Sequence, residues 1–487
     1  MSAGSVSTGH APAGAAPVGA TEAGAAPPVE EFGTVHLVGI GGVGMSGLAR
    51  LLLTRGLRVT GSELQPWPAL ADLRALGGTI HTSHAPSNLD GVDTVVYSSA
   101  IPADHVELVE ARRRGLRLLH RSEALAAAMA GRRVIAVAGT HGKTTTTAMV
   151  ALMLRQAGLD PSFFVGGEII GPLGNAQHGT GAHFVVEADE HDRSFLRYRP
   201  YVAVVTNVDT DHLNNFGDLA GLTAAFEEFT DTVVPDGFVV TCADDDATRR
   251  IAARLRAAGR TVHTYGRAAD ADLRVIDLAG SATGVRYRAV LDGTPLGELA
   301  LPVPGPHLAV NSAAAALVAL RLGATPTAVA AALASFPGMR RRFEHKGTAG
   351  GVRVYDEYAY HPTSMAAALR TLRQIAGAGQ LIVVFQPYRL YRTRQLGAEL
   401  AATLSMADHA LVLEVFAPGE TRQPGEGGQT LTAAIDLPPD RKAFLAWQDV
   451  AAEVAARARP GDLVVTMGAP PISLLGDELL AALGGGR

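Results

Sequence analysis

The fold of this chain is decided by one stretch, Val134-Ile135-Ala136-Val137-Ala138-Gly139-Thr140-His141-Gly142-Lys143-Thr144-Thr145-Thr146-Thr147. An apolar run meets a glycine turn, and four threonines then open a predicted helix. Strand, glycine turn and helix in this order are typical of a phosphate-binding loop, in which backbone N–H groups hold phosphate oxygens and a Thr hydroxyl reaches Mg²⁺. The spacing is the short form Gly139-x-x-Gly142-Lys143-Thr144, since Val137 stands where the commoner pattern has its first glycine. A glycine turn with an incidental lysine is the alternative.

The lysine of this loop is informative because the chain rarely uses lysine. Only Lys143, Lys346 and Lys442 occur among 42 basic residues, and the others are arginines. A compact ammonium under a β- or γ-phosphate is not easily replaced by a planar guanidinium. We therefore expect Lys143 to neutralise phosphate charge.

Composition bounds the class of protein. The 487 residues are too many for one core and predict about three domains. With 47% hydrophobic and 18% charged residues the chain is globular. The net charge is −5, and basic runs occur only at 112–114 and 340–342, so a nucleic-acid partner is not favoured.

The single cysteine, Cys242, excludes an intramolecular disulfide framework and fits a reducing compartment. Residues 1–32 form an Ala/Gly/Pro-rich tail that we expect to be disordered, without the pattern of a signal peptide. The sequence contains no stretch of 18 uncharged apolar residues, so no membrane span is predicted. We therefore expect a soluble, cytoplasmic protein.

The predicted organisation is α/β throughout, with three domains after the tail. Residues 33–130 alternate strands and helices as a Rossmann-like, doubly wound unit. Residues 131–335 restart with the phosphate-loop strand and give a central P-loop ATPase-like domain, in which 261–277 and 284–303 alternate like a smaller mixed sheet and an alanine-rich helix covers 309–322. Residues 336–487 give a third, Rossmann-like α/β domain.

Another glycine-rich segment lies nearer the N-terminus, after the first predicted strand of the chain. Gly39, Gly41 and Gly44 fit G-x-G-x-x-G between a predicted strand and helix, with the acidic Glu63 some 20 residues later. The pattern fits a nicotinamide dinucleotide and equally a diphosphate nucleotide such as a UDP-sugar. Glycines that serve only strand–helix packing are the third possibility.

Two acidic segments each follow a predicted strand of the central domain. Glu187-Ala188-Asp189-Glu190-His191-Asp192 closes one strand, and Asn207-Val208-Asp209-Thr210-Asp211-His212 closes the next. Ligands gather at the carboxyl edge of parallel strands, so these side chains should converge with Thr144. Oxygen ligands with one imidazole suit Mg²⁺ or Mn²⁺ between phosphates. Solvated acidic loops are the alternative.

The order of motifs resembles the ATP-dependent Mur ligases, which join amino acids to a UDP-sugar in peptidoglycan synthesis. The resemblance covers residues 33–487. It is carried by 39–47, Ser98-Ser99-Ala100-Ile101, 139–147, Glu187 to Asp192, His307 with Asn311, Arg340-Arg341-Arg342-Phe343-Glu344, Glu357 to Thr363 and Val384-Phe385-Gln386-Pro387. Within the family, these motifs are most similar to the member that adds L-alanine to UDP-N-acetylmuramate.

The resemblance implies three sites. The UDP-sugar would bind at Gly39, Gly41, Gly42, Gly44, Ser62 and Ser98. ATP would bind at Gly139, Thr140, His141, Gly142, Lys143, Thr144, Thr145, His307 and Asn311, with Mg²⁺ held by Thr144, Glu187 and His212. His307 and Asn311 lie four residues apart on a predicted helix, which a buried core helix would also explain. The catalytic residues would be Lys143, His212, His361 and Arg340, and the amino acid would meet His361 and Arg392 or Arg394.

The implied reaction is ligation through an acyl phosphate, for which charge neutralisation and positioning are the catalytic tasks. The chain departs from the family pattern mainly on the acceptor side, where Tyr360, Ser364, Tyr388, Pro470 and Pro471 replace usual residues, while His191 and Asn214 are further departures. We therefore expect alanine as the amino acid, but with weaker selectivity than is usual in the family, so that glycine or serine is accepted comparably.

Three alternatives to the alanine-adding ligase stay open. A ligase of the same fold with a different amino acid or a side-pathway substrate is the first. A nucleotide-binding module without turnover is the second, since the departures lie in the acceptor motifs. A nicotinamide-dependent oxidoreductase is disfavoured, because it leaves the second phosphate loop and its acidic neighbours without a role.

Overall fold

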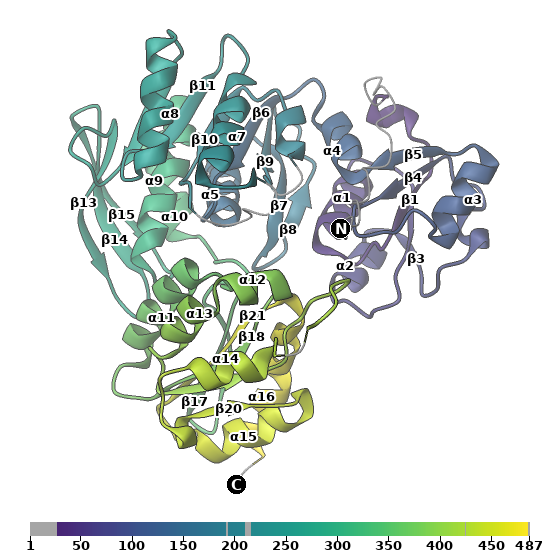
Figure 1. Cartoon of the computed structure of the whole chain (residues 1–487). Coiled ribbons are helices and arrows are strands. Elements are labelled where there is room, and N and C mark those ends of the chain that lie inside the picture. Colours follow the sequence, from purple (N-terminus) through teal and green to yellow (C-terminus); the bar gives the residue numbers. More distant parts are fainter. Residues whose placement is uncertain (1–26, 191–192, 210–215, 424, 486–487) are drawn as a thin grey trace, which may run out of the picture.

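The computed structural model describes residues 27–190, 193–209, 216–423 and 425–485. Three α/β domains follow one another along the chain, each built on its own sheet. Figure 1 shows the N-terminal domain in purple, the middle domain in blue to green, and the C-terminal domain in green to yellow. The predicted fold class is therefore confirmed. Among the described residues, no helix is long and apolar enough to cross a membrane.

The first domain has a parallel five-stranded sheet of order β3-β2-β1-β4-β5. Its strands are β1 (Val35–Val38), β2 (Val59–Ser62), β3 (Thr79–His81), β4 (Thr94–Tyr97) and β5 (Arg117–His120); its helices are α1 (Val43–Thr54), α2 (Ala69–Ala75), α3 (Val106–Arg114) and α4 (Arg121–Met129), with 3-10 turns η1 (Val29–Glu31) and η2 (Pro86–Leu89). The strand order reverses between β1 and β4, which is where doubly wound folds bind ligands.

The packed chain begins before residue 33. Val29 of η1 and the following Phe32 are fully buried against this domain, although both lie in the segment predicted as a tail. Val29 and Phe32 stand at the end of a segment that is otherwise rich in Ala, Gly and Pro. The average composition of residues 1–32 therefore does not reveal that its last residues are buried.

The middle domain has one ten-stranded sheet of order β15-β14-β13-β12-β11-β10-β6-β9-β7-β8. Its strands are β6 (Arg133–Ala138), β7 (Ser162–Ile169), β8 (Gly174–Gln177), β9 (His183–Glu187), β10 (Val202–Val205), β11 (Phe238–Cys242), β12 (Val262–Gly266), β13 (Leu273–Gly280), β14 (Val285–Leu291) and β15 (Thr294–Leu301). Its helices are α5 (Lys143–Gln156), α7 (Leu219–Asp231), α8 (Asp246–Ala257), α9 (Pro306–Arg321) and α10 (Pro326–Ala334), with the 3-10 turn η3 (Ser194–Arg197).

The strands predicted as a smaller mixed sheet belong to this large sheet. β12 pairs in parallel with β13 through Tyr265 and Leu273, and β13, β14 and β15 then continue antiparallel. Alternation along the chain identifies strands but does not say which edge they join, so the sequence could not separate an extension from a second sheet.

The C-terminal domain has a six-stranded sheet of order β16-β17-β21-β18-β19-β20, in which only the β16–β17 pair is antiparallel. Its strands are β16 (Glu344–Ala349), β17 (Val352–Glu357), β18 (Leu381–Gln386), β19 (His409–Val412), β20 (Lys442–Phe444) and β21 (Leu463–Gly468). Its helices are α11 (Pro362–Ala376), α12 (Leu390–Gln395), α13 (Gly397–Leu404), α14 (Gly428–Ala434), α15 (Val450–Arg457) and α16 (Leu475–Gly484), with 3-10 turns η4 (Pro439–Arg441), η5 (Trp447–Asp449) and η6 (Pro470–Leu474).

Helix α9 packs closely on α5 and so brings a second helix to the phosphate loop. The run Ala313 to Ala316 is fully buried, because alanines let the two helix backbones approach. The predicted alanine-rich helix is confirmed. Its first turns carry Asn311 to Gly142, at the start of α5.

Candidate functional site

The loop between β6 and α5 needs glycine at both of its glycine positions. Gly139 has φ +122°, and a Cβ there would lie 2.1 Å from the Thr206 hydroxyl oxygen. Gly142 has φ +83°, and a Cβ there would lie 2.6 Å from Asn311 Oδ1. Since L side chains rarely adopt such φ values and neighbours fill the space, these glycines set the shape of the turn.

Lys143 folds back over this turn. Its Nζ donates to the carbonyl oxygens of Gly139 (2.6 Å) and Thr140 (3.2 Å) and to Glu190 Oε1 (2.9 Å). Burial works to lower the pKa of Lys143, but the nearby carboxylates of Glu190, Asp189 and Glu187 outweigh it and raise that pKa. The ammonium is therefore fixed in its charged form at the mouth of the loop.

Glu190 is the partner of this ammonium and is 1% exposed. Burial is the largest influence on it and raises the pKa of Glu190 to about 7, against the opposing charge of Lys143. Its second carboxyl oxygen, Oε2, has no hydrogen-bond partner. The sequence does not distinguish Glu190, because carboxylates on either side of it share the same acidic segment.

Thr144 and Glu187 meet at the carboxyl edge of the sheet, as predicted. Thr144 Oγ1 donates to Glu187 Oε1 at 3.0 Å, and the N–H of Gly166 donates to Glu187 Oε2 at 2.7 Å. Burial raises the pKa of Glu187, with Lys143 acting in the opposite direction. The site thus holds a hydroxyl and a carboxylate, whose oxygens can both serve as metal ligands.

Two further predicted residues belong to this region. Thr145 is buried in the first turn of α5. The third predicted ligand, His212, lies outside the described residues.

An arginine of the next domain reaches the same hydroxyl. Arg342 Nη2 donates to Thr144 Oγ1 at 3.1 Å. The neighbouring residues, Arg341 and Phe343, have positive φ values of 61° and 50°, so the segment that aims Arg342 is held in a strained conformation. The predicted Arg340 lies differently: it pairs with Glu168 and Glu344 and is half-exposed. Three consecutive arginines look equivalent in sequence, and only the turn distinguishes them.

Two histidines join the phosphate loop to the C-terminal domain. The ring of His141 lies 5.6 Å from the ring of His361, and His141 Nε2 lies 2.9 Å from Asp209 Oδ2. One ligand atom from each of the three residues lies within 4.8 Å of the others. His361 is buried and caps the first turn of α11. Thr140 fixes Asp209 further, because its Oγ1 accepts from the Asp209 N–H at 2.9 Å.

His307 and Asn311 lie at the start of α9, on the side that faces α5. Burial, with a further contribution from Arg342, lowers the pKa of His307 to about 4, so the imidazole is neutral. Its ring lies 5.8 Å from Phe343. His307 and Asn311 therefore lie beside the phosphate loop, where Asn311 lies against Gly142.

The first glycine loop joins β1 to α1. Gly39 has φ +68° and donates to the Ser62 carbonyl, and Gly41 donates to Glu63 Oε2 at 3.1 Å. Gly42 precedes the first residue of α1. A Cβ on Gly44 would lie 3.0 Å from Arg121 Nη1, so the guanidinium from α4 rests against the loop. Nothing in the local pattern of the loop indicates Arg121.

The other predicted residues of this domain lie at strand ends. Ser98 follows β4, beside the loop in the strand order. The hydroxyl of Ser62 instead turns into the domain, where it donates to Glu107 Oε2 (2.7 Å) and lies 2.9 Å from His84 Nδ1. Burial opposes the charge of Glu107, but hydrogen bonds from His36, Ser62 and Asn88 lower its pKa to about 2.

The two arginines predicted to meet an amino acid are separated by the structure. Arg392 is 3% exposed and points among tyrosine rings. Arg394 is exposed and pairs with Glu426 at 2.6 Å. Arg392 is therefore the inward-facing one.

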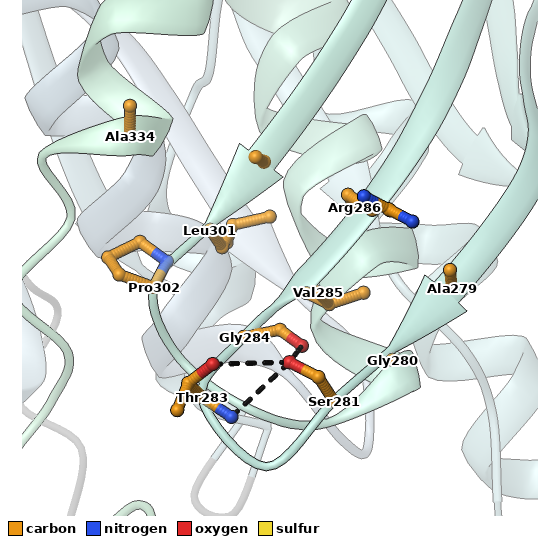
Figure 2. A pocket seen from close by; sticks show the side chains of 11 residues that line it. Ala279, Gly280, Ser281, Thr283, Gly284, Val285, Arg286, Leu301, Pro302 and Ala334 are labelled. Carbon is orange, nitrogen blue, oxygen red and sulfur yellow. Dashed lines mark hydrogen bonds between the residues drawn. The ribbon is translucent and has the colours of Figure 1, made fainter.

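An open hollow of the middle domain lies elsewhere. Figure 2 shows it at the ends of β13, β14 and β15 beside Ala334, with a volume of about 490 Å³. Ser281 hydrogen-bonds to Thr283 and Gly284 within its rim (Figure 2). None of the predicted site residues lines it, and Arg286 is its one charged side chain.

Comparisons with known proteins agree with this geometry. The Mur ligase family catalytic domain matches residues 34–133, the Mur ligase middle domain matches 137–319, and the glutamate ligase domain of Mur ligases matches 341–470. The chain belongs to the Mur ligase family. The resemblance found in the sequence is thus confirmed for all three domains of this Mur ligase.

Two curated relatives of this Mur ligase have the same name. The UDP-N-acetylmuramate–L-alanine ligase of Salinispora arenicola is 65% identical over 94% of this chain and 90% of its own length. That of Acidothermus cellulolyticus is 49% identical over 94% and 96%. A crystal structure of the UDP-N-acetylmuramate–alanine ligase from Thermotoga maritima has a TM-score of 0.78 and 27% identity, covering 93% of this chain and all of that one. The MurF ligase from T. maritima in complex with ADP has the same fold, with a TM-score of 0.61 and 17% identity, covering 90% and 98%.

Proposed function

We propose that this chain is an ATP-dependent ligase that joins an amino acid, L-alanine in its relatives, to UDP-N-acetylmuramate for peptidoglycan synthesis. The observation that carries the proposal is the meeting of Lys143, Thr144 and Glu187 with Arg342 of the next domain at one loop. Two cations, a hydroxyl and a half-buried carboxylate suit a transferring phosphoryl group. Relatives 65% and 49% identical are named for this ligation.

In the proposed reaction, a carboxylate oxygen of the sugar attacks the γ-phosphorus of ATP and ADP leaves, giving an acyl phosphate. The amino group of the amino acid then attacks the acyl carbon, phosphate leaves and the nitrogen loses a proton. Lys143 would release Glu190 and turn to the phosphate oxygens. The backbone N–H groups at the start of α5 would hold the same oxygens.

Thr144 and Glu187 would hold Mg²⁺, since their hydroxyl and carboxylate are oxygen donors of the kind that this ion takes. When bound, the ion would neutralise phosphate charge. His212 stays a predicted third ligand. Arg342 would leave Thr144 and face the phosphoryl oxygens, so the C-terminal domain would complete the site. Arg340 stays a predicted contributor from the same turn, where it pairs with Glu168 and Glu344.

The UDP-sugar would bind at the first glycine loop. Gly39, Gly41, Gly42 and Gly44 would let the backbone approach the diphosphate closely. Arg121, which rests against Gly44, would add the positive charge that the loop lacks. Ser98 would line the neighbouring strand end. Under this proposal, residues 33–130 bind the sugar nucleotide, 131–335 bind ATP, and 336–487 bring the amino acid.

One assay tests the proposal. Phosphate release is followed with ATP, Mg²⁺ and UDP-N-acetylmuramate, and each of the twenty amino acids is added in turn. Release that depends on an amino acid, with the ligated product identified by mass, is the expected result. Calorimetry with UDP and NADH on the full chain is the companion measurement, and affinity for NADH with none for UDP would overturn the proposal at its first step.

A second candidate is a ligase of the same reaction with another amino acid. It is favoured by Tyr360 and Tyr388, which lie on the acceptor side beside Arg392. The same assay decides between the two.

A further inference from the structure

Three side chains of the first domain lie close together, and we call them the histidine–glutamate group: His84, His105 and Glu107. One nitrogen or carboxylate oxygen from each of them lies within 4.8 Å of the others. His84 follows β3, His105 is the N-cap residue of α3, and Glu107 lies in the first turn of that helix. Two connections of the sheet therefore bring three metal-binding side chains to one place.

The carboxylate of this group is charged and has no partner of fixed positive charge. Glu107 has no exposed side-chain surface. Burial works against its charge, yet hydrogen bonds hold the pKa of Glu107 at about 2, so the group is ionised. Its ion pairs among the described residues are with His36 (3.6 Å) and His84 (3.5 Å), and both rings are charged only when protonated. Because a buried carboxylate without a cation is costly, a bound cation would stabilise it.

The two oxygens of Glu107 have different surroundings. Oε1 accepts from Asn88 Nδ2 at 2.8 Å and is the oxygen that faces His36. Oε2 is the oxygen that faces His84. Hydrogen bonds to one oxygen of a metal-binding carboxylate orient the other oxygen toward the ion. Asn88 and His36 therefore hold Glu107 with Oε2 directed into the group.

The spacing between His84 and Glu107 fits an ion better than it fits a hydrogen bond. Nδ1 and Oε2 lie 3.5 Å apart, beyond the usual range for N–H···O. Bonds of about 2.0–2.2 Å to a tetrahedral zinc ion place neighbouring ligand atoms about 3.3–3.6 Å apart. Ser62 Oγ lies 2.7 Å from the same Oε2 and 2.9 Å from the same Nδ1. Since a hydroxyl has one hydrogen, it cannot donate to both atoms, and a cation between them would satisfy both.

The second imidazole closes the group. The ring centre of His105 lies 4.5 Å from that of His84 at 79°, so the edge of one ring meets the face of the other. His105 Nδ1 accepts from the Glu107 N–H at 3.3 Å, which is long for such a bond. Both rings are half-buried. An ion can therefore reach the group from solvent, and it competes only with this weak bond for a lone pair of His105.

We propose that His84, His105 and Glu107 bind one Zn²⁺ ion, with water at the fourth position. Two imidazole nitrogens and one carboxylate oxygen are a usual ligand set for zinc, whereas Mg²⁺ prefers oxygen donors and keeps much of its water. The zinc site is separate from the Mg²⁺ site proposed at the phosphate loop, and it does not depend on the ligation activity.

The position of the site gives the ion a structural role. Ser62, which lies against two of the proposed ligands, is the last residue of β2. Its carbonyl accepts from the N–H groups of Gly39 (2.9 Å) and Ile40 (3.1 Å). An ion that fixes the ligands would hold this strand end under the first glycine loop. Zn²⁺ should therefore raise the Tm of the chain in the absence of ATP and UDP-sugar, since it binds the folded state.

The test measures metal binding by the full-length protein after treatment with EDTA, in excess Mg²⁺ so that sites of oxygen donors are filled. Co²⁺, whose visible absorption reports a four-coordinate site, is titrated in and is then displaced by Zn²⁺. We expect one equivalent of four-coordinate Co²⁺ that depends on this group. His84→Ala and Glu107→Gln should each weaken its binding at least about 100-fold, because the loss of an outer hydrogen bond alone costs about 10- to 100-fold. The rise in Tm with Zn²⁺ should disappear in the same variants.

Two control variants separate this group from other histidines. His120 caps α4 by accepting from the Ser122 N–H, as His105 caps α3, so His120→Ala tests for the loss of a cap alone. His141→Ala removes a ring from the other close cluster of possible ligands, which is formed with Asp209 and His361. Both variants should keep the equivalent of Co²⁺ that His84→Ala loses.

The contradicting outcomes are equally direct. Unchanged Co²⁺ binding in folded His84→Ala overturns the proposal, and so does loss of the equivalent in His141→Ala. Absence of any binding at micromolar free Co²⁺ or Zn²⁺ overturns it as well. Because Glu107 is fully buried, His105→Ala takes the place of Glu107→Gln where circular dichroism shows that the latter is unfolded. None of these measurements uses turnover, so a failure of the proposed ligation would leave their result unchanged.

Discussion

The two glycine loops of this molecule share strand, turn and helix but receive their positive charge from different places. The second loop carries Lys143 within itself, paired with a buried carboxylate, and gains Arg342 from the next domain. The first loop has no basic residue between Gly39 and Gly47, and Arg121 from a later helix rests on it instead. A loop that contains its own cation can be identified from local sequence, whereas one that borrows a cation cannot.

The largest expected effect is at the second loop's own cation. Lys143→Ala should lower amino-acid-dependent phosphate release by about 10²- to 10³-fold or more, because Lys143 is the lysine of this loop and would neutralise the phosphate charge. The chain should stay folded by circular dichroism. Lys442→Ala is the control, since that lysine donates to the carbonyls of Ala433 and Ile435 in the C-terminal domain. Near wild-type turnover in folded Lys143→Ala would remove the phosphate-loop assignment.

The second-largest loss of activity is expected at Arg342, the cation that this loop receives from the C-terminal domain. Arg342→Ala should lower kcat by about 10²-fold, and Arg342→Lys should recover little, because a lysine cannot reproduce the planar fork. Arg340→Ala is the matched control in the same basic run, and we expect its effect to be only a few-fold because Arg340 is half-exposed. Equal losses in both variants would contradict the placement of Arg342.

The metal requirement of the second loop is the third test. Glu187→Gln should raise the Mg²⁺ concentration at half-maximal rate by about tenfold or more, because the variant loses an anionic oxygen donor. Glu168→Gln, which changes a half-exposed carboxylate beside Arg340, serves as control. An unchanged midpoint would show that the ion binds elsewhere.

At the first loop the loss of activity should be smaller, and it should appear in the KM of the UDP-sugar instead of in kcat. Arg121→Ala should raise the KM of the UDP-sugar several-fold, up to about tenfold, and leave kcat unchanged, since one contact worth about 1.4 kcal/mol is tenfold in binding. The effect should shrink in high salt. Arg112→Ala, on the exposed end of α3, is the control. A loss in kcat instead would mean that Arg121 acts in the chemical step.

The smallest effect is in stability. His307 has its pKa lowered to about 4 by burial and by Arg342, from an ordinary value near 6.5. Between those pH values the unfolded chain binds a proton that the folded chain does not, so stability falls as the pH falls through this window. The advantage of wild type over His307→Gln in unfolding free energy should shrink by about 1.4 kcal/mol per pH unit from 6.5 towards 4. A constant difference in urea unfolding would contradict a buried neutral His307.

The sequence predicted what is local or periodic. The strand of Val134 to Ala138, the helix at 309–322 and the convergence of Glu187 with Thr144 follow from strand edges and helical spacing. It could not choose among Arg340, Arg341 and Arg342, since a turn with two positive φ values aims only one of them at the loop. Arg121, Glu190 and the packing of Tyr360 on Tyr388 depend on contacts between distant segments. Adjacent residues carry no signal of such contacts.

Because the chain has three lysines, a reagent that acylates amino groups can modify few of its side chains. Lys143, at 13% side-chain exposure and paired with Glu190, should acylate slowly until the loop opens. An endoproteinase that cuts after lysine divides the sequence at 143, 346 and 442. An acylated Lys143 blocks the first cut and leaves a fragment in which residues 143 and 144 stay joined, whichever other lysines have reacted. The yield of that fragment would therefore report how often the ammonium leaves its carboxylate, in a population of molecules and without any turnover.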